Sequence, residues 1–314
     1  MFEFYKILLK LKFRMLRGRL ENCPPARMPW LLRQLFHART GKWPEGDFAT
    51  LNEKIIWAMM FDATALKCKC ADKFRVREYV AEKVGEKYLP ALYGVYDSPD
   101  EIDLADLPKK FIFQFNAGTG RQKIVLDKSA LNMAELVPVM RGWIARKYWA
   151  KTAELQYKSP PKIVARELLD IRLDREFRIY CIGGKVQFIM HRSYERGKAH
   201  IGLRYYGRDW GDPGFAPAMR GSKFYAMKPI TKPETMDEMI ELAEKLATPF
   251  EFVCADFYEL AGGGVKFGEL TFASFRGTLR FVPNIPTQLK YGALFKLPRR
   301  DKDGFSAGGR ANLA

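Results

Sequence analysis

The chain has 314 residues, of which 47% are hydrophobic, 14% aromatic and 28% charged, so it can bury a sizeable core and is not wholly disordered. Its net charge of +17 favours anionic partners such as nucleotide phosphates, nucleic acid or an anionic membrane surface. No apolar run reaches the roughly 20 residues that span a bilayer, and the N-terminus lacks a signal-peptide pattern, so we expect a cytoplasmic location. The cysteines are odd in number and lack the usual zinc spacing, which indicates free thiols.

Residues 1–20 are predicted to form one amphipathic helix, ended by Pro24 and Pro25. One stripe of the helix is apolar (Phe2, Tyr5, Leu9, Phe13, Leu16 and Leu20). A second stripe is basic (Lys6, Lys10, Arg14 and Arg17). Two interpretations stay open. The helix either docks on its own domain or lies on an anionic membrane surface, which would place the protein peripherally at the inner face of the plasma membrane.

The rest of the chain mixes helical and extended patterns. Further helices are expected at residues 29–37, 53–61 (with Asn52 as N-cap), 72–83, 133–149 and 234–246. Strands are expected at residues 88–96, 110–115, 123–126, 162–168, 175–182, 185–191, 250–258 and 265–272. The basic tail after Pro298 is expected to be mobile. This order predicts an α+β fold with largely antiparallel strands and disfavours a doubly wound parallel sheet.

Two acidic residues stand out on the last two predicted strands. If the glycine turn between these strands is centred between Gly262 and Gly263, Asp256 lies directly opposite Glu269. Thr271 then shares the face of Glu269, because strands alternate with period two. Opposed like charges are unfavourable unless a cation lies between them, and Mg²⁺ prefers carboxylates together with phosphate oxygens. Two acids on a solvent-facing hairpin are the alternative interpretation.

A glycine-bearing loop, residues 116–120, lies between two predicted strands. Small residues let backbone N–H groups approach phosphate oxygens, although a simple turn has the same composition. The loop is not a Walker motif, since no Gly-Lys-Ser/Thr follows it. A turn centred between Gly118 and Thr119 would place Lys123 opposite Gln114 on one face. Lys123 would then reach the phosphates, whereas a register change of one residue would send it to the other face.

Four segments together resemble the TupA-like branch of the ATP-grasp superfamily: Leu51-Asn-Glu-Lys-Ile-Ile-Trp57, Asp72-Lys-Phe-Arg-Val-Arg-Glu-Tyr79, Asn116-x-Gly-Thr-Gly120 and Phe267-Gly-Glu-Leu-Thr-Phe272. The resemblance implies an ATP-grasp fold in which two α+β lobes grip ATP and Mg²⁺. It implies ATP-dependent carboxylate–amine ligation through an acyl phosphate, in cell-surface polysaccharide or polyanionic polymer synthesis. We expect a helical region (1–38), a preceding domain (39–108), a lid (109–160), a C-terminal lobe (161–298) and a flexible tail (299–314).

The resemblance also implies roles for individual residues. The metal ligands would be Asp256, Glu269 and Thr271. The nucleotide would contact Lys73, Gln114, Asn116, Gly118, Thr119, Gly120, Glu167, Glu176 and Arg178. We place Arg276 and Lys123 in the catalytic set. The chain departs from the family pattern at Gln114 and Ala117, where a lysine and a histidine are usual, and a neutral amide cannot replace an ammonium on a phosphate.

These observations favour an ATP- and Mg²⁺-dependent ligase that joins an acidic sugar or other carboxylate to an amine. A basic stretch is a candidate site for that acid (Arg192, Arg196, Lys198, Arg204 and Arg208), and Arg280 beside Arg276 is another. A noncatalytic or repurposed member, acting as a scaffold or a sugar transferase in the same pathway, is the alternative. Nucleic-acid binding is disfavoured, because only the net charge suggests it and no RNA-binding motif accompanies that charge.

Overall fold

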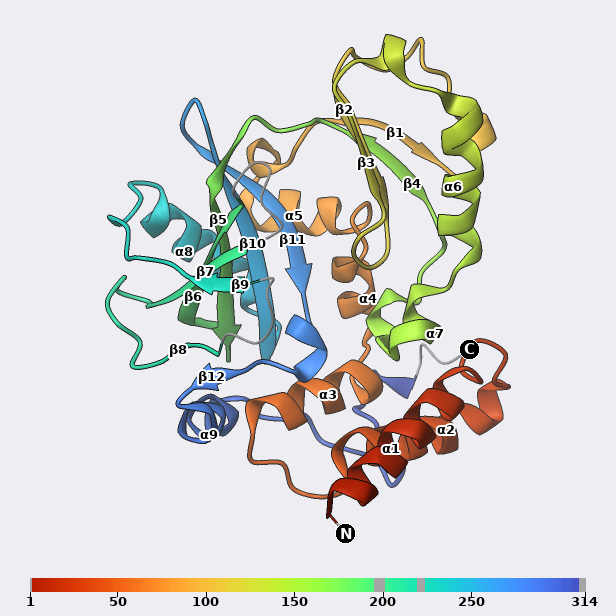
Figure 1. Cartoon of the computed structure of the whole chain (residues 1–314), viewed down its shortest axis with the longest axis vertical. Helices are drawn as coiled ribbons and strands as arrows, with labels where there is room; N and C mark the ends of the chain where they lie inside the picture. The colour runs from red at the N-terminus through yellow and green to blue at the C-terminus, as the bar shows by residue number, and fades with distance from the viewer. Residues whose placement is uncertain (1, 195–200, 219–223, 311–314) are drawn as a thin grey trace.

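The computed structural model describes residues 2–194, 201–218 and 224–310, and it has a helical base below two β-sheets (Figure 1). The base consists of α1 (Phe2–Arg17), α2 (Met28–Thr40), α3 (Leu51–Phe61) and α9 (Asn284–Leu294). Short 3₁₀ turns punctuate the chain: η1 (Pro25–Arg27), η2 (Glu86–Tyr88), η3 (Pro99–Glu101), η4 (Lys128–Ala130), η5 (Leu155–Tyr157) and η6 (Ser274–Gly277). None of the described helices is long and apolar enough to cross a lipid bilayer.

Helix α3 forms the centre of the base. Its N-cap is Thr50, whose side chain and that of Glu53 form a capping box, so the expectation of Asn52 as the cap is wrong. The Asn52 side chain instead bonds to both backbone polar groups of Leu279. Trp57 is fully buried. Helix α3 therefore connects the N-terminal helices with the segment that follows the strand at residues 265–271.

Helix α1 docks on α2, as the first interpretation of the N-terminus predicted. Leu16 and Leu20 are buried in the main core, and Phe13 packs against it. A different stripe of α1 stays exposed, with Ile7, Leu8, Leu11 and Met15 between 47% and 68% accessible. The helix is therefore docked along one side and apolar on another side that contacts solvent.

The described part of the C-terminal tail, residues 299–310, is docked, which differs from the expectation of a mobile segment; residues 311–314 lie outside the described residues. Phe305 is fully buried and contacts Phe61 edge-to-face, with ring centroids 5.1 Å apart. The Ser306 hydroxyl donates to Asp62 at 2.7 Å. The composition of the tail is polar overall, but one aromatic side chain is enough to anchor it over α3.

The smaller sheet has the strand order β1-β4-β2-β3 and is antiparallel throughout. Its strands are β1 (Leu92–Tyr96), β2 (Phe111–Phe115), β3 (Gln122–Val125) and β4 (Ile163–Arg166). Helix α6 (Met133–Ala145) covers one face through a small separate core that includes Phe111, Phe113 and Met140. The helix expected at 133–149 ends at Ala145, and α7 (Tyr148–Thr152) begins after a break.

The larger sheet has the order β11-β10-β5-β6-β7-β9, and only the β7–β9 pair is parallel. Its strands are β5 (Ile171–Ile182), β6 (Lys185–Tyr194), β7 (Ile201–Gly207), β9 (Phe224–Ala226), β10 (Phe252–Leu260) and β11 (Val265–Thr271). Helix α8 (Met236–Ala247) packs on one face, with α5 (Val76–Val84) and α4 (Ala65–Ala71) nearby. Strands β8 (Ala216–Pro217) and β12 (Phe281–Val282) form a separate ladder.

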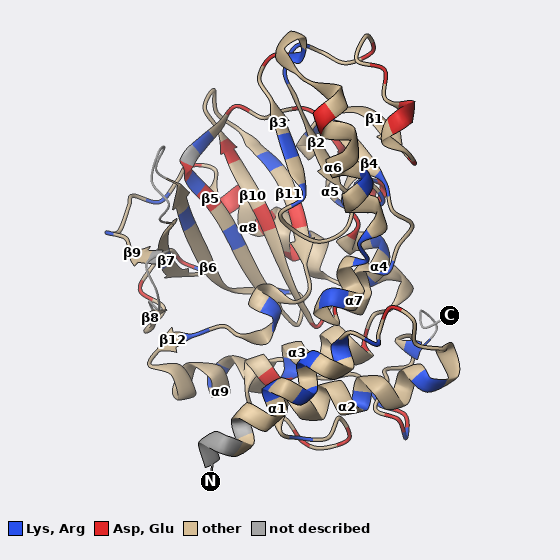
Figure 2. Cartoon of the chain, turned by 45° about the vertical axis from the view of Figure 1, so that its right-hand side comes forward, with Lys and Arg blue, Asp and Glu red and all other residues tan. Residues whose placement is uncertain are grey.

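The α+β prediction with largely antiparallel sheets is confirmed. Strand alternation also sorts the side chains of β5: Phe177 and Ile179 are apolar and fully buried, while Glu176 and Arg178 point to the opposite face. Figure 2 shows acidic and basic residues on neighbouring stretches of β5, β10 and β11, and ion pairs join Arg178 to Asp256 and Glu269 across these strands. The fold thus places a charged face between the two sheets.

Candidate active site

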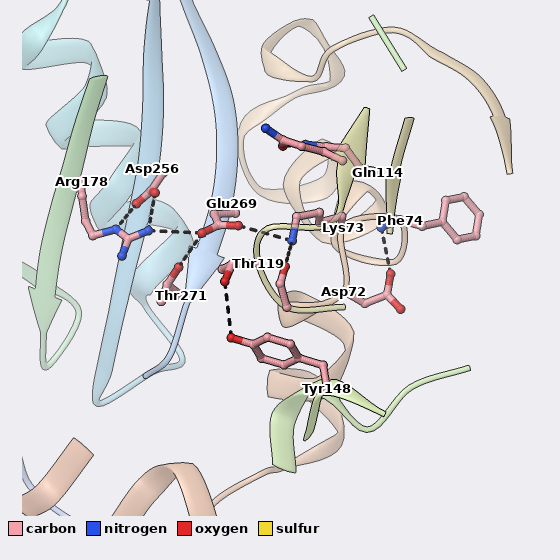
Figure 3. Close-up of polar contacts among 12 residues, drawn as sticks. Asp72, Lys73, Phe74, Gln114, Thr119, Tyr148, Arg178, Asp256, Glu269 and Thr271 are labelled. Atoms are coloured by element: carbon pink, nitrogen blue, oxygen red, sulfur yellow. Dashed lines mark hydrogen bonds and ion pairs between the residues drawn. The ribbon is translucent and has the colours of Figure 1, made fainter. Parts of the chain in front are cut away.

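A buried arginine joins the two acids of the β10–β11 hairpin (Figure 3). Arg178 donates from Nε to Asp256 Oδ1 at 2.7 Å and from a terminal nitrogen to Oδ2 at 2.6 Å. The same terminal nitrogen lies 3.2 Å from Glu269 Oε1. Arg192 on β6 also donates to Asp256 Oδ2 at 2.8 Å and pairs with Glu176. Charge-assisted bonds of this kind are strong and directional, so the side chains form one network.

The hairpin register agrees with the prediction at one end and differs at the site itself. Cys254 pairs with Thr271, as the turn-centred register requires. A β-bulge follows, so that Asp256 faces Gly268 and Glu269 together instead of Glu269 alone. The expectation of a direct Asp256–Glu269 pair is therefore wrong. The bulge brings Glu269 within reach of Arg178 from the neighbouring strand.

The network shifts the proton affinities of its members. Burial alone would raise the pKa of Glu269, but Lys73, Arg178 and Arg192 outweigh burial and hold that pKa below its usual value. Burial raises the pKa of Glu176, although Arg192 opposes the shift. Burial would lower the pKa of Arg178, but Asp256 raises it well above its usual value. Glu269 and Arg178 are therefore both charged at neutral pH.

Lys73 connects this network to the glycine loop. Its Nζ donates to the carbonyl oxygen of Gly118 at 2.5 Å and lies 3.5 Å from Glu269 Oε2. The backbone around Lys73 is held by Asp72, whose carboxylate accepts from two following backbone N–H groups and from Asn116 at 2.6 Å. Lys73 is thus a cation placed between the loop and an acid.

The glycine loop is shaped by close packing. Gly118 and Gly120 have φ values of +78° and +77°, which favour glycine. A Cβ on Gly118 would lie 2.4 Å from the ring of Tyr148, so this glycine also makes room for the aromatic ring. Thr119 Oγ1 lies 3.5 Å from the Tyr148 hydroxyl. The loop therefore rests against α7 and presents Thr119 toward the space between the sheets (Figure 3).

Asn116 anchors this loop. It is fully buried, and its side chain bonds to Asp72, to the Pro160 carbonyl and to the Lys162 backbone N–H. These bonds engage both ends of its amide, so the side chain positions the loop. Its predicted direct contact with the nucleotide would break this network.

Of the two registers left open for the β2–β3 turn, the structure has the one that sends Lys123 to the other face from Gln114. Gln114 pairs with Gln122, and the exposed Lys123 lies opposite Phe113 on the face that α6 covers. The turn is one residue out of the assumed register, and a shift of one residue exchanges the two faces of a strand. Lys123 therefore cannot act as the substitute cation beside Gln114.

Arg166 is a functional candidate that sequence reasoning missed. Its Nε donates to Gln114 Oε1 at 2.7 Å, and the Gln114 amide nitrogen donates to Gln122 at 3.1 Å. Val164 pairs with Gln114, so alternation along β4 places Arg166 on the same face as Gln114. The family lysine is absent at position 114, but this neighbouring guanidinium supplies a positive charge. Arg166 and Gln114 are far apart in the sequence, so their contact becomes evident only from the pairing of β2 with β4.

The other predicted residues lie around this centre. The Glu167 carboxylate accepts from the Ala91 backbone N–H at 3.0 Å, in the link between the sheets. Arg276 is exposed in η6, beyond the end of β11 and next to α2, and so lies outside the network. In the basic stretch, Arg192 joins the network, whereas Arg208 pairs with Glu244 on α8. Residues 196 and 198 lie outside the described residues.

The acids fit a divalent cation only together with other ligands. In the described part of the chain, no group of three or more His, Cys, Asp or Glu side chains is arranged to hold a metal. Asp256 accepts three bonds from Arg178 and Arg192, which leaves about one of its roughly four lone-pair positions. Glu269 Oε2 and the Thr271 hydroxyl are less engaged. The donor set therefore suits Mg²⁺, which binds one or two carboxylates and takes phosphate oxygens and water for the rest.

One cavity between the sheets has a volume of about 20 Å³ and is lined by Lys73, Gln114, Arg166 and Gly268 among others. This volume suits about one water molecule. A larger ligand would enter this cavity only if its lining side chains moved apart.

A family model for TupA-like ATP-grasp proteins matches residues 53–296. This stretch contains both sheets, the glycine loop and all the charged residues of the network, so the protein is an ATP-grasp protein. Within that superfamily, the chain belongs to the TupA-like ATP-grasp family, as its motifs indicated.

Three solved structures illustrate how distant the similar folds are. An L-amino acid ligase from Bacillus licheniformis is 14% identical over 83% of this chain and 54% of its own, with a TM-score of 0.42. The ATP-grasp ligase PsnB, in complex with a minimal precursor, is 14% identical over 73% of this chain and 62% of its own (TM-score 0.40). The ADP complex of an N5-carboxyaminoimidazole ribonucleotide synthetase is 13% identical over 65% and 45% (TM-score 0.40). The chain thus spans between 45% and 62% of their lengths. A search of curated proteins found no match.

Proposed function

We propose that the protein is an ATP- and Mg²⁺-dependent carboxylate–amine ligase. The observation that carries this proposal is the position of Lys73, between the Gly118 carbonyl of the glycine loop and the Glu269 carboxylate. Phosphoryl transfer is catalysed mainly by positioning and by neutralising charge on the phosphate oxygens. A cation held between a glycine loop and a metal-binding acid performs both tasks.

The reaction has two displacements. A substrate carboxylate oxygen attacks the γ-phosphorus of ATP, the bond to the β-phosphate oxygen breaks, and ADP leaves. The amine then attacks the carbonyl carbon of the acyl phosphate, inorganic phosphate leaves, and the nitrogen loses a proton. Bound Mg²⁺, held by Asp256, Glu269 and Thr271, would supply positive charge to the phosphate oxygens.

The side chains of this protein would bind and orient the nucleotide. Lys73 and Arg166 both line the small cavity between the sheets. Gln114 orients Arg166 by accepting a 2.7 Å hydrogen bond from it. The Arg166 guanidinium, on the neighbouring strand, would then provide the positive charge that the lysine provides in the family pattern. Arg178 holds Asp256 and Glu269 in one arrangement. Glu167 and Glu176 remain candidates for contacts with the adenine and ribose.

The test is Glu269→Gln, with Glu259→Gln as the matched control on the paired strand. Glu259 bonds to Arg175 outside the network. We expect Glu269→Gln to weaken Mg²⁺-dependent ATP binding at least tenfold in calorimetry, and to abolish ADP release with a panel of carboxylates and amines. Glu259→Gln should change either quantity less than twofold. Unchanged Mg²⁺–ATP affinity in Glu269→Gln would contradict the proposal.

A repurposed family member is the second candidate, and the neutral Gln114 favours it. It would bind nucleotide yet release no ADP with any carboxylate and amine pair. Nucleotide-sugar consumption without ATP cleavage would instead indicate a sugar transferase. Restoring the family residue in Gln114→Lys separates these cases, because a weakened ligase should gain ADP release and a scaffold should not.

The cellular setting is part of the proposal. We place the ligase in cell-surface polysaccharide or polyanionic polymer synthesis, with an acidic sugar or another carboxylate as one substrate and an amine as the other. The net charge of +17 and the exposed stripe of α1 support work near an anionic membrane surface. Replacing the exposed Ile7, Leu8, Leu11 and Met15 by serine should abolish binding to phosphatidylglycerol vesicles, with the fold retained in circular dichroism. Equal binding by the parent and this variant would contradict it.

A further inference from the structure

A second, larger cavity lies in the helical base, apart from the space between the sheets. Its volume is about 670 Å³, within the range of small-molecule sites. Its walls come from α1, α2, α7 and η6. Five of its lining side chains are cationic: Lys10, Arg14, Arg17, Arg39 and Arg276. We call it the basic pocket.

The positive charges of the basic pocket are neutralised only in part. Among the side chains that the structure describes, no carboxylate forms an ion pair with any of the five cations. Arg39 and Arg17 instead lie over the ring of Phe13, at 5.6 Å and 5.9 Å from its centroid. Cation–π contacts position guanidinium groups without cancelling their charge.

The cations also repel one another. Burial lowers the pKa of Arg39 to about 10, and Arg276 and Arg17 add to the decrease while Glu154 opposes it. Glu154 is only 3% exposed, and burial raises its pKa to about 7, so at neutral pH it offsets the cations only in part. An anion in the pocket would relieve this repulsion.

The backbone holds Arg276 at the pocket. Phe275 and Arg276 both adopt positive φ, at +47° and +54°, which non-glycine residues seldom do. The Arg39 guanidinium donates to the Arg276 carbonyl and ties η6 to α2. Arg276 follows Thr271, the last residue of β11, by five residues, so the segment that leaves β11 forms part of the pocket wall.

An apolar ridge leads into the basic pocket. The exposed side chains of Ile7, Leu8, Leu11 and Met15 form one stripe along α1, and two of them, Ile7 and Leu11, also line the pocket. The ridge and the cations are therefore parts of one continuous surface. A free nucleotide or an inorganic anion has no hydrocarbon chain that could contact such a ridge. An anionic amphiphile has both an anionic group for the cations and a hydrocarbon chain for the ridge.

We propose that the basic pocket binds an amphiphilic phosphate. Its phosphate or diphosphate group lies among the five cations, and its hydrocarbon chain lies along the apolar ridge of α1. This inference goes beyond the ligase activity, and the binding does not depend on ATP turnover. If the ligase proposal also holds, such an amphiphilic phosphate would carry the substrate, and the pocket would hold this carrier near the segment that follows β11.

The experiment measures binding of dodecyl phosphate below its micelle concentration, of inorganic pyrophosphate, and of phosphatidylglycerol vesicles, in the absence of ATP. We expect dodecyl phosphate to bind at least tenfold more tightly than pyrophosphate. The double variant Arg14→Gln/Arg17→Gln should lose at least tenfold affinity for dodecyl phosphate. Lys12→Gln is the matched control on α1, because Lys12 bonds to Gln34 away from the pocket, and it should change affinity less than twofold.

A ridge variant separates the two parts of the ligand. Leu8→Ser/Met15→Ser changes exposed residues outside the pocket lining, so it should weaken dodecyl phosphate binding several-fold and leave pyrophosphate binding unchanged. Binding to vesicles but not to monomeric dodecyl phosphate would overturn the proposal, since the ridge alone would then be used. Equal affinity of the Arg14→Gln/Arg17→Gln variant and the parent would also overturn it, and a melting curve for each variant confirms that it is folded.

Discussion

Replacing Arg178 by methionine tests whether the charged network stabilises the space between the sheets. The change keeps an unbranched apolar stem and removes the guanidinium that bonds to Asp256 at 2.6–2.7 Å and to Glu269 at 3.2 Å. Breaking a buried ion pair costs about 3–5 kcal/mol because a charge is left uncompensated. Asp256 keeps its 2.8 Å bond from Arg192, and Glu269 keeps Lys73 at 3.5 Å. We therefore expect the lower end of the range, about 3 kcal/mol.

Urea unfolding of the parent and of Arg178→Met at neutral and acid pH measures this loss. Burial raises the pKa of Glu269, but Lys73 and Arg178 hold it below its usual value. The ionised Glu269 therefore stabilises the folded parent at pH values above the usual carboxylate pKa, and this stabilisation is lost as the pH falls. The difference in unfolding free energy between the parent and Arg178→Met should therefore decrease toward pH ~4. The control Arg172→Met removes a 41% exposed arginine of the same strand and should cost less than about 1 kcal/mol. A loss below about 1 kcal/mol in Arg178→Met, or a gap that stays constant into acid, would refute the reasoning.

Three further predictions concern the loop, the buried acid and the tail. Gly118→Ala should cost more than about 2 kcal/mol, because its Cβ meets the Tyr148 ring at 2.4 Å and φ is +78°. Gly120→Ala has the same φ problem without a neighbour within 4 Å, so it should cost about 1 kcal/mol; equal urea midpoints for the two would contradict the steric argument. Burial raises the pKa of Glu154 from 4.5 to about 7, so between these pH values the folded state binds a proton that the unfolded state has lost. The free energy of unfolding of the parent should therefore fall by about 3 kcal/mol as the pH rises through this range. Glu154→Gln should remove this slope and be the more stable protein at pH ~8, and a parent-like slope in the variant would show that another group titrates. Phe305→Ala should cost about 3–5 kcal/mol because the ring is fully buried, whereas a tail that did not pack would leave the unfolding midpoint unchanged.

The sequence by itself determined the local elements and the identity of most site residues. Alternation along β10 and β11 placed Asp256, Glu269 and Thr271 near one another, because side-chain direction follows directly from strand period. The glycine loop and the motif around Lys73 indicated the family, which the matched stretch 53–296 confirms. The amphipathic pattern of residues 1–20 indicated the stripe of α1 that docks, but not the exposed apolar stripe of Ile7, Leu8, Leu11 and Met15.

The tertiary structure alone decided how those residues meet. A bulge at Asp256 and a one-residue difference in the β2–β3 turn changed which side chains lie opposite each other. The alternating pattern of a strand specifies which residues share a face, but it does not specify where a turn is centred or where a bulge inserts an extra residue. Arg178 and Arg166 entered the site through pairing with strands that are remote in sequence. The basic pocket likewise requires α1 and α2 to lie against η6, more than 230 residues away along the chain from Arg39. Long-range contacts of this kind depend on how whole surfaces pack, and no local pattern encodes them.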